Sequence, residues 1–395
     1  MIKKGEHTVY RIGNEEAEAV RRVIDSKQLF KVNGGLHEAQ KAEEELCATF
    51  ASPHAILMTS GHAALVSALV AMGIGPGDQV IVPAYTYIAT AMAVVAAGAI
   101  PVICEVDDTL TMDPDDMEAR ITPATRAVIP VHIQGFPCQM DKIMAIARRH
   151  GLLVLEDACQ ADGGSFGGRR LGTIGDAGAL SFNFYKVITC GEGGALLTGS
   201  REIFERALIY HDSSAIAFFG NQMQGFSATP FCGNEYRTNE LPAAILRVQL
   251  SRLDGILADL RSRRAAILSG IGDAATPAPS HDGAGDCATT LALRFETAEH
   301  ADRVARAIGG ICPINTDKHV YCNWGPILER RGALHPAMDP FRMEANRGII
   351  PDYRRDMCPR TLDLLARTVY LSLTPDMSDA ECAAIAARIR ATALS

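Results

Sequence analysis

Short apolar runs alternate with helix-like segments between residues 55 and 199 of this 395-residue chain. Runs that are apolar at nearly every position predict strands buried on both faces of a sheet. Parallel strands need crossovers, and segments such as HAALVSALVAMG and MDKIMAIARRHG have the length and pattern of crossover helices. We therefore predict an α/β fold with a mostly parallel sheet covered by helices. The predicted strands are AILMT (55–59), QVIVP (79–83), PVICEV (101–106), AVIPVH (127–132), LLVLE (152–156), ALSFN (179–183) and GALLT (194–198).

The chain on either side of this alternation is predicted to be helical. Residues 14–50 contain two helical patterns separated by the pair Gly34-Gly35. Residues 237–267 form one long helical pattern. A bend in this helix at Pro242 is an alternative to a straight helix.

The remaining C-terminal part is predicted to form a second, smaller unit. The stretch 271–286, rich in Gly, Ala and Pro, is predicted to be a linker or surface loop, and a final helix is predicted from about Ser378. We divide the chain into a large domain, residues 1–255, which includes the N-terminal helices, and a small α/β domain, residues 256–395.

The composition argues against several classes of protein. A net charge of −8 is unfavourable for broad contact with nucleic acid. The apolar stretch 91–104 is too short to span a membrane, and the first residues, MIKKGEHTVYRIG, lack the apolar core of a secretory signal. The 11 cysteines are scattered without a CxxC pair, which fits reduced thiols. We expect a cytoplasmic protein without a nucleic-acid or membrane partner.

Unusual polar residues follow the predicted strands, where ligands collect in open parallel sheets. In TSGHAAL (59–65) small residues leave the first N–H groups of a helix open to an anion, although Ser60 could simply cap that helix. Asp157 follows the run LVLE, and it too could be a helix cap.

Two further strand ends carry a lysine and aromatic residues. Lys186 precedes the glycine-rich turn GEGG, and a lysine in a loop is ordinarily a solvated charge. Tyr85 and Tyr87 lie in VPAYTYIAT, where aromatic residues ordinarily belong to the core. In combination, an anion seat, a carboxylate, an aromatic ring and an amine match the needs of pyridoxal 5′-phosphate (PLP), namely its phosphate, ring nitrogen, ring face and aldehyde.

These segments also resemble one known family. The chain is similar over nearly its whole length to the sugar aminotransferases of the DegT/DnrJ/StrS family, which are PLP enzymes of fold type I. The resemblance implies a large domain with a mostly parallel sheet and a smaller C-terminal α/β domain. The matching stretches are SGHAAL, GPGDQVIVPAYTYIATA, MDPDDMEARITPATRAVIPVHIQG, LEDACQADGGSFGGRRLGTIGDAGALSFN, KVITCGEGG and YRTNELPAAILRVQLSRLD.

The resemblance implies a role for each matching residue. Lys186 matches the lysine that forms the Schiff base and then shuttles the proton. Asp157 matches the partner of the pyridinium nitrogen, Gln160 the support near the ring hydroxyl, and Tyr87 the aromatic residue stacked on the ring. The implied phosphate contacts are Gly61, His62, Ala63 and Ser181.

The chain departs from the family pattern at two of its phosphate positions. His62 replaces the usual threonine, and an imidazole can still donate to a phosphate. The family motif GxNxR reads GNEYR here, which places Glu235 where an asparagine reaches the phosphate of a second subunit. A carboxylate would repel that phosphate, so we expect the neighbouring Asn234 to make the contact. The resemblance thus implies a homodimer with shared active sites.

The stretch HVYCNWGPILERRGALHPAMDPF (319–341) resembles members of the family that act on keto-cyclitols, while other segments resemble enzymes that aminate keto sugars. We predict His319 and Tyr321 as substrate contacts, with Asn323 and Trp324 as further candidates; the alternative is that Trp324 and Tyr321 pack in a core. A nucleotide-linked acceptor would need local positive charge, for which the candidates are Arg169, Arg170, Lys318, Arg354 and Arg355.

The expected reaction is amination of a sugar or cyclitol ketone, with L-glutamate or L-glutamine as donor, by a ping-pong mechanism through pyridoxamine phosphate. A PLP-dependent dehydratase or lyase is an alternative, although family members of that kind carry histidine where this chain has Lys186. A non-catalytic, regulatory protein on a transaminase-like scaffold is a second alternative. We expect no metal site, because the residues before Lys186 offer no metal ligand and no cysteine triad has iron–sulfur spacing.

Overall fold

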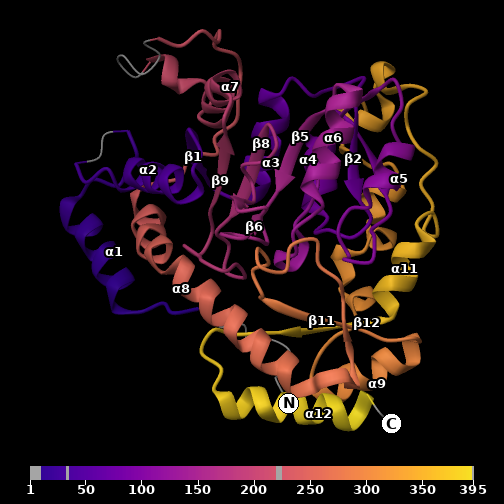
Figure 1. Cartoon of the computed structure of the whole chain (residues 1–395). Helices are drawn as coiled ribbons and strands as arrows, with labels where there is room; N and C mark the ends of the chain where they lie inside the picture. Colours follow the sequence, from indigo (N-terminus) through magenta and orange to yellow (C-terminus); the bar gives the residue numbers. More distant parts are fainter. Residues whose placement is uncertain (1–9, 33–34, 219–224, 394–395) are drawn as a thin grey trace.

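The computed structural model describes residues 10–32, 35–218 and 225–393. Gly34 of the predicted glycine pair and the first nine residues lie outside this range. Figure 1 shows two parts of different size, a large sheet with helices packed around it and a smaller sheet below it. The long helix α8 (Glu240–Ile271) joins the two parts.

The large sheet has seven strands in the order β1-β9-β8-β5-β4-β2-β3. Only β9 runs antiparallel to its neighbours, β1 and β8, and the other pairs are parallel. The predicted mostly parallel sheet is therefore confirmed, and each predicted run overlaps one strand. The strands are β1 (His54–Met58), β2 (Gln79–Pro83), β3 (Ile100–Cys104), β4 (Thr125–Val128), β5 (Leu153–Asp157), β8 (Ala177–Ser181) and β9 (Gly194–Thr198).

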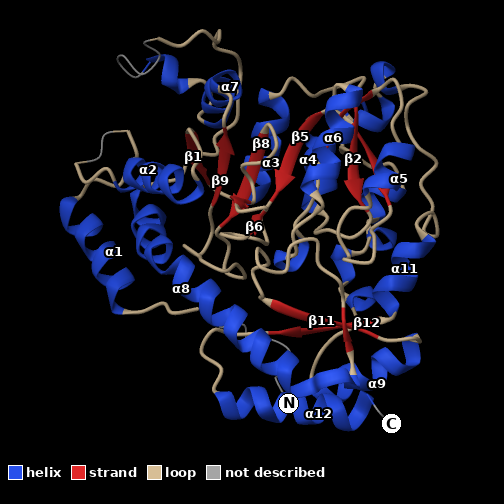
Figure 2. Cartoon of the chain, viewed as in Figure 1, coloured by secondary structure: helices blue, strands red, loops and turns tan. Residues whose placement is uncertain are grey.

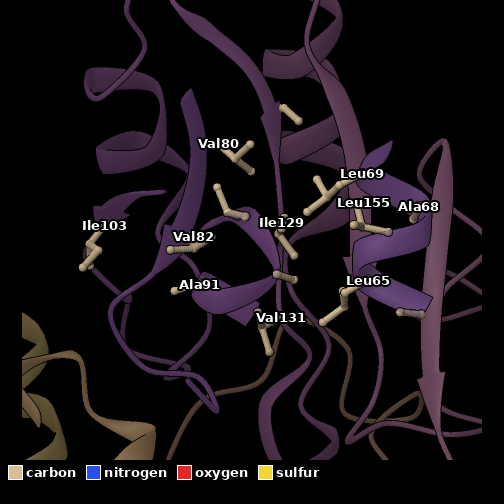
Figure 3. Close-up of a cluster of buried hydrophobic side chains, with 14 of the residues drawn as sticks. Leu65, Ala68, Leu69, Val80, Val82, Ala91, Ile103, Ile129, Val131 and Leu155 are labelled. Carbon is tan, nitrogen blue, oxygen red and sulfur yellow. The ribbon is translucent and has the colours of Figure 1, made fainter. Parts of the chain in front are cut away.

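Side chains alternate between the two faces of this sheet, and both faces are buried. Val80 and Val82 of β2 belong to one core cluster, whereas Ile81 between them belongs to another. Figure 3 shows the first cluster, where Leu65 and Leu69 of α3 (Gly61–Ala71) pack close to strand residues. Burial on both faces explains why the strand sequences are continuously apolar. The other helices packed around this sheet are α2 (Glu38–Phe50), α4 (Ala89–Ala96), α5 (Pro114–Ala119), α6 (Met140–His150) and α7 (Arg201–His211).

Helix α8 continues for 32 residues through the predicted domain boundary at residue 255. It contacts α1 (Asn14–Ser26) and α2 near its start and α12 (Asp379–Ala393) near its end (Figure 2). Pro242 lies in its first turn, where a missing N–H costs no helical hydrogen bond, so α8 simply begins there. The division at residue 255 stays a prediction. None of the described helices is long and apolar enough to cross a membrane.

The small sheet consists of β10 (Thr276–Pro277), β11 (Thr290–Arg294) and β12 (Thr368–Ser372), all antiparallel, with α9 (Ala298–Ile308) and α12 packed on it. The predicted linker 271–286 is held in place rather than free. Ser165 of the hairpin β6 (Ser165–Phe166) and β7 (Arg169–Arg170) donates its N–H to the Gly285 carbonyl at 2.9 Å.

Residues 313–358 belong to the C-terminal half of the sequence, yet they cover the large sheet. Val320, Tyr321 and Trp324 are fully buried in the same core cluster as the strands β2 and β5. The segment contains the short helix α10 (Gly325–Leu328) and ends at α11 (Pro359–Ala366).

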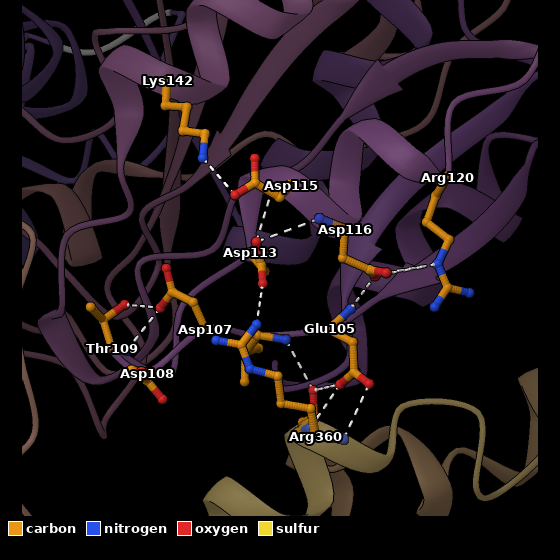
Figure 4. A network of polar contacts seen from close by, with 12 residues as sticks. Glu105, Asp107, Asp108, Thr109, Asp113, Asp115, Asp116, Arg120, Lys142 and Arg360 are labelled. Carbon is orange, nitrogen blue, oxygen red and sulfur yellow. Dashed lines mark hydrogen bonds and ion pairs between the residues drawn. The ribbon is translucent and has the colours of Figure 1, made fainter.

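Helix α11 is held against the large sheet by acidic side chains. Glu105, just after β3, accepts the N–H of Arg360 at 3.2 Å and that of Thr361 at 2.7 Å (Figure 4). The Arg360 guanidinium also pairs with Asp113 at 2.6 Å. This carboxylate network therefore supplies the cap for α11.

Candidate active site

Two adjacent carboxylates at the end of β5 point to opposite sides of the strand, as neighbouring strand residues must. Glu156 is fully buried and holds the following loop, because it accepts the N–H of Gly175 at 2.7 Å and contacts the imidazole of His132 at 3.0 Å. Asp157, which is 5% exposed, accepts the hydroxyl of Thr90 at 2.7 Å and the N–H of Cys159 at 3.2 Å. Turns rather than a helix follow Asp157, so the helix-cap alternative does not apply.

Close packing of backbones brings the start of α3 against the ends of β5 and β8. A Cβ atom on Gly61 would lie 2.6 Å from the Sγ of Cys159 and 2.9 Å from the Cβ of Ser181. A Cβ on Gly194, in the GEGG turn, would lie 2.3 Å from the carbonyl carbon of Ser60. Only glycine fits at these two positions, and this explains part of the glycine-rich pattern.

The N-terminus of α3 offers fewer open amides than predicted. Ser60 is the cap residue, and its hydroxyl oxygen accepts the N–H of Ala63 at 3.1 Å. The amide of Ala63 is therefore already bonded, which argues against the predicted phosphate contact through that group. The first two helical residues, Gly61 and His62, keep their amides for an anion.

His62 lies against helix α4 in a partly buried position. Its Nδ1 contacts the Ala89 carbonyl at 3.3 Å, which requires a proton on that nitrogen. Burial lowers the pKa of His62, although the Ala89 carbonyl and the Asp157 carboxylate oppose the shift. The neutral ring then presents Nε2 as an acceptor, so His62 can donate to a phosphate only after it gains a second proton.

Lys186 lies in the loop that follows β8, with its N–H bonded to the Asn183 carbonyl at 3.0 Å. Lys186 and Asp157 come from neighbouring strands, because β5, which ends at Asp157, pairs with β8, which the loop of Lys186 follows. Burial is the main cause that raises the pKa of Cys159, and the charge of Asp157 raises it while that of Lys186 lowers it. The N–H of Cys159 also bonds Asp157.

A second strip of backbone joins the loop after β2 to residues 318–321. Thr86 donates its N–H to the His319 carbonyl at 3.0 Å, and Tyr321 donates to the Ala84 carbonyl at 3.0 Å. This pairing places the His319 ring 5.5 Å from the ring of Tyr87. Tyr87 is 39% exposed and available to a ligand, whereas Tyr85 is 1% exposed and belongs to the core.

The pKa of His319 responds to the charges of two lysines. Burial is the main cause that lowers the pKa of His319, and the positive charges of Lys186 and Lys318 lower it further. The His319 ring lies beside Tyr87, and its contact with a substrate stays a prediction.

Tyr321 and Trp324 support this strip from inside the core. Tyr321 is fully buried, and its hydroxyl donates to the Arg355 carbonyl at 2.8 Å and accepts the N–H of Cys358 at 2.9 Å. Trp324 is fully buried and donates its indole N–H to the Lys318 carbonyl at 2.9 Å. The core-packing alternative holds for both residues, and the prediction that Tyr321 contacts the substrate is corrected.

The other predicted residues are held by local contacts. The side chain of Gln160 accepts the N–H of Gln134 at 3.1 Å, and the backbone of Gln134 is in the left-handed conformation. Asn234 is exposed and donates to the Tyr210 hydroxyl at 2.6 Å. Glu235 pairs with Arg237 at 2.7 Å within its own chain.

Sequence reasoning missed two residues beside this group, Thr90 and Asp162. Thr90 fixes Asp157, but a threonine in an apolar helix carries no signal of that contact. Asp162 is fully buried, and neither of its carboxylate oxygens has a hydrogen-bond partner among the described residues. Burial raises the pKa of Asp162 well above its ordinary value, and the charge of Lys186 acts in the opposite direction. An acid after EDACQA is visible in the sequence, but its burial is not.

The assembled residues fit PLP. Asp157 is a buried carboxylate fixed by two donors, the amides of Gly61 and His62 are open at a helix N-terminus, and Lys186 supplies the amine. Tyr87 offers an exposed ring beside them.

Comparison with known proteins agrees with this set of residues. GDP-perosamine synthase of Caulobacter vibrioides is 40% identical over 249 residues, which are 63% of this chain and 65% of that protein. The dTDP-3-amino-3,4,6-trideoxy-alpha-D-glucose transaminase of Streptomyces venezuelae is 39% identical over 259 residues, 65% of each protein. The chain therefore spans just under two thirds of the length of these curated relatives.

The similarity in structure extends further along the chain. The X-ray structure of an aminotransferase from Psychrobacter cryohalolentis matches with a TM-score of 0.80 at 28% identity, and the match covers 98% of each chain. A family model described as the DegT/DnrJ/EryC1/StrS aminotransferase family matches residues 10–320. The chain belongs to the DegT/DnrJ/EryC1/StrS aminotransferase family.

Proposed function

We propose that the protein is a PLP-dependent aminotransferase that moves an amino group from L-glutamate or L-glutamine to a ketone of a sugar or cyclitol. One observation carries the proposal: the Asp157 carboxylate is buried and fixed by Thr90 and the Cys159 amide at the end of β5, and Lys186 lies in the loop that follows the neighbouring strand β8. A fixed carboxylate beside a lysine is the pair that this cofactor chemistry needs. The membership of the family supports the same reaction.

When bound, PLP supplies an aldehyde for the amine and an electron sink for the bond that breaks. Asp157 keeps a proton on the ring nitrogen, and Thr90 keeps Asp157 in place. The amides of Gly61 and His62 hold the phosphate. The Nζ of Lys186 would hold the aldehyde of the cofactor, and once free it would carry the proton from the donor's α-carbon to the cofactor. In the second half of the cycle Lys186 moves a proton in the reverse direction for the ketone.

The class of acceptor is the open part of this proposal. The two curated relatives are named for GDP- and dTDP-linked sugars. The family match ends at residue 320, so most of the covering segment 313–358 lies beyond it. His319, beside Tyr87 and Lys186, is the residue of that segment that we propose as an acceptor contact. We therefore keep both nucleotide-linked keto sugars and keto-cyclitols as substrates to be tested.

We also propose a homodimer in which each active site borrows residues from the second subunit. Tyr185, directly before Lys186, is 69% exposed, and Phe184 is 39% exposed. Large apolar side chains at such positions are typical of interaction surfaces. Asn234, which is exposed and bonds the Tyr210 hydroxyl, is the residue that would reach the phosphate of the partner. Sedimentation of the purified protein tests the dimer.

The function is tested by reduction of the holoprotein with borohydride, followed by peptide mapping. The label is expected on Lys186, and the visible absorption of the wild-type protein is expected to change when glutamate or glutamine is added. A label on another lysine, or a Lys186→Ala protein that keeps its turnover, would contradict the proposal. Mass spectrometry of the product distinguishes an amine from the dehydrated sugar that a dehydratase would release.

A further inference from the structure

Lys318 has a fixed backbone and a free side chain. Its carbonyl accepts two donors, the N–H of Ile88 at 3.1 Å and the indole N–H of Trp324 at 2.9 Å. The first donor belongs to the loop that carries Tyr87, and the second lies in the core. The position of residue 318 relative to Tyr87 is therefore fixed by the fold, although its side chain is exposed.

The ammonium of Lys318 lies over an aromatic ring instead of a carboxylate. Its Nζ is 5.0 Å from the centroid of the Tyr87 ring. Within the described part of the chain, no acidic side chain forms an ion pair with Lys318. A cation over a ring retains most of its ability to bind an anion, because the ring neutralises none of its charge.

The other basic residues that the sequence offered for anion binding are already engaged. Arg169 donates to the Thr173 carbonyl, Arg170 pairs with Asp254, Arg354 pairs with Asp352, and Arg355 donates to the Cys322 carbonyl. Lys318 differs from all four, because among the described residues its side chain lies over Tyr87 and has no hydrogen-bond or ion-pair partner.

The surroundings of Lys318 connect it to the chemistry at Lys186. Burial and the positive charges of Lys186 and Lys318 together lower the pKa of His319, so both amines lie within electrostatic reach of one imidazole. In the proposed function Lys186 is committed to the aldehyde and to proton transfer. Lys318 is then the cation that remains beside Tyr87 and His319 for a charged part of a substrate.

We propose that Lys318 is a specificity-determining residue that binds an oxyanion of the substrate, a carboxylate or a phosphate, at the edge formed by Tyr87 and His319. The inference rests on the proposed function and deepens it. The oxyanion has two possible sources, the carboxylate of the amino-acid donor and the diphosphate of a nucleotide-linked acceptor. Both call for the same charge-assisted hydrogen bond from Nζ.

The test uses the holoprotein and separates the two sources. In one arm, L-glutamate is titrated while the visible absorption of the bound cofactor is followed. In the other arm, the binding of GDP and of dTDP is measured by calorimetry. The variants are Lys318→Met and Lys318→Gln, which remove the charge, and Lys318→Arg, which keeps it. Lys142→Met is the matched control, since it removes one exposed lysine on α6 whose ion pair with Asp115 contributes little.

Loss of the charge is expected to weaken binding about tenfold in at least one arm, with less than about a twofold change in the rate at saturating glutamate. Lys318→Arg is expected to stay within about threefold of wild type, and Lys142→Met within about twofold. An effect confined to glutamate assigns the carboxylate, and one confined to GDP or dTDP assigns the phosphate.

Binding within about twofold of wild type in both arms for Lys318→Met and Lys318→Gln would overturn the inference. Failure of the proposed function is a separate result, recognised by a wild-type protein without visible absorption after loading with PLP. The calorimetric arm reports on Lys318 in that case as well.

Discussion

Asp157 and His319 reach the same group of residues by different routes. Asp157 is the last residue of a strand inside a seven-stranded sheet, so the ladder of β5 and β8 determines where its carboxylate lies. His319 belongs to a segment without regular strands, and backbone bonds to the loop 84–88 and the buried ring of Trp324 determine its place. Asp157 is thus positioned by the large sheet and by Thr90, whereas His319, which we assign to substrate recognition, is positioned by the loop before α4 and by Trp324. Chemistry and specificity are therefore expected to respond to different mutations.

The largest effect is expected from Asp157→Asn. The amide cannot hold a proton on the ring nitrogen, so turnover is expected to fall by about 10³-fold, or about 4 kcal/mol. The binding of GDP or dTDP is expected to change little, because Asp157 is fixed by Thr90 and not by the covering segment. Steady-state kinetics and calorimetry on the same preparation measure both. Equal losses of turnover and nucleotide binding would break the distinction between the two regions.

The second largest effect is expected in the covering segment, residues 313–358. Trp324→Ala removes a fully buried ring and the donor to the Lys318 carbonyl, and it is expected to lower the free energy of unfolding by about 3–5 kcal/mol. Leu334→Ala in the same segment is the control, since Leu334 is 103% exposed and its loss is expected to cost less than about 0.5 kcal/mol. Urea unfolding measures both variants. Equal stabilities of the two variants would show that the ring of Trp324 does not hold the segment.

A smaller effect is expected from Thr90→Val. This change keeps the shape of the side chain but removes the hydroxyl that donates to Asp157 at 2.7 Å, so turnover is expected to fall about tenfold. The lost bond costs about 1.4 kcal/mol by the same arithmetic. Thr90→Ser, which keeps the hydroxyl, is expected to recover most of the activity. A serine variant as slow as the valine variant would mean that packing, not the hydrogen bond, is what Thr90 contributes.

The smallest effect is expected from His62 and depends on pH. Burial holds the pKa of His62 in the folded protein below its ordinary value of about 6.5, so the unfolded chain binds the proton first as the pH falls. His62 therefore lowers the stability of the folded protein as the pH falls below about 6.5, and it has no such effect above that pH. Urea unfolding of the protein without PLP at two pH values, compared with His62→Thr, measures this contribution. A wild-type protein that loses no more stability than His62→Thr at low pH would contradict the assignment.

The sequence was sufficient for the regions that follow local rules. The apolar runs predicted the strands, and the strand pattern predicted that Asp157 and Lys186 would belong to neighbouring strand ends, which the pairing of β5 with β8 confirms. It was insufficient where a contact joins distant residues. Whether Tyr321 faces a substrate or the core depends on Arg355 and Cys358, and no periodicity reveals those partners.

The open amide predicted at Ala63 fails for a local reason instead. The amide of Ala63 was counted as open, although the Ser60 hydroxyl already accepts it. A helix cap and an anion-binding site at a helix N-terminus have the same residues in sequence. Only the rotamer of Ser60 decides whether its hydroxyl occupies the amide of Ala63. The stretch 271–286 is largely the surface loop that its composition predicted, but its backbone contact with Ser165, more than a hundred residues earlier, has no signal in the sequence.

Helix α8 has a mechanical consequence. It is one uninterrupted rod of 32 residues, about 48 Å long, in contact with α1 and α2 near one end and α12 near the other. A helix without a break bends only gently, so the small sheet cannot swing toward the large one by flexing inside α8. Any such rotation has to pivot at the ends of the rod, and it would be transmitted as a lever motion to the N-terminal helices on the far side of the molecule.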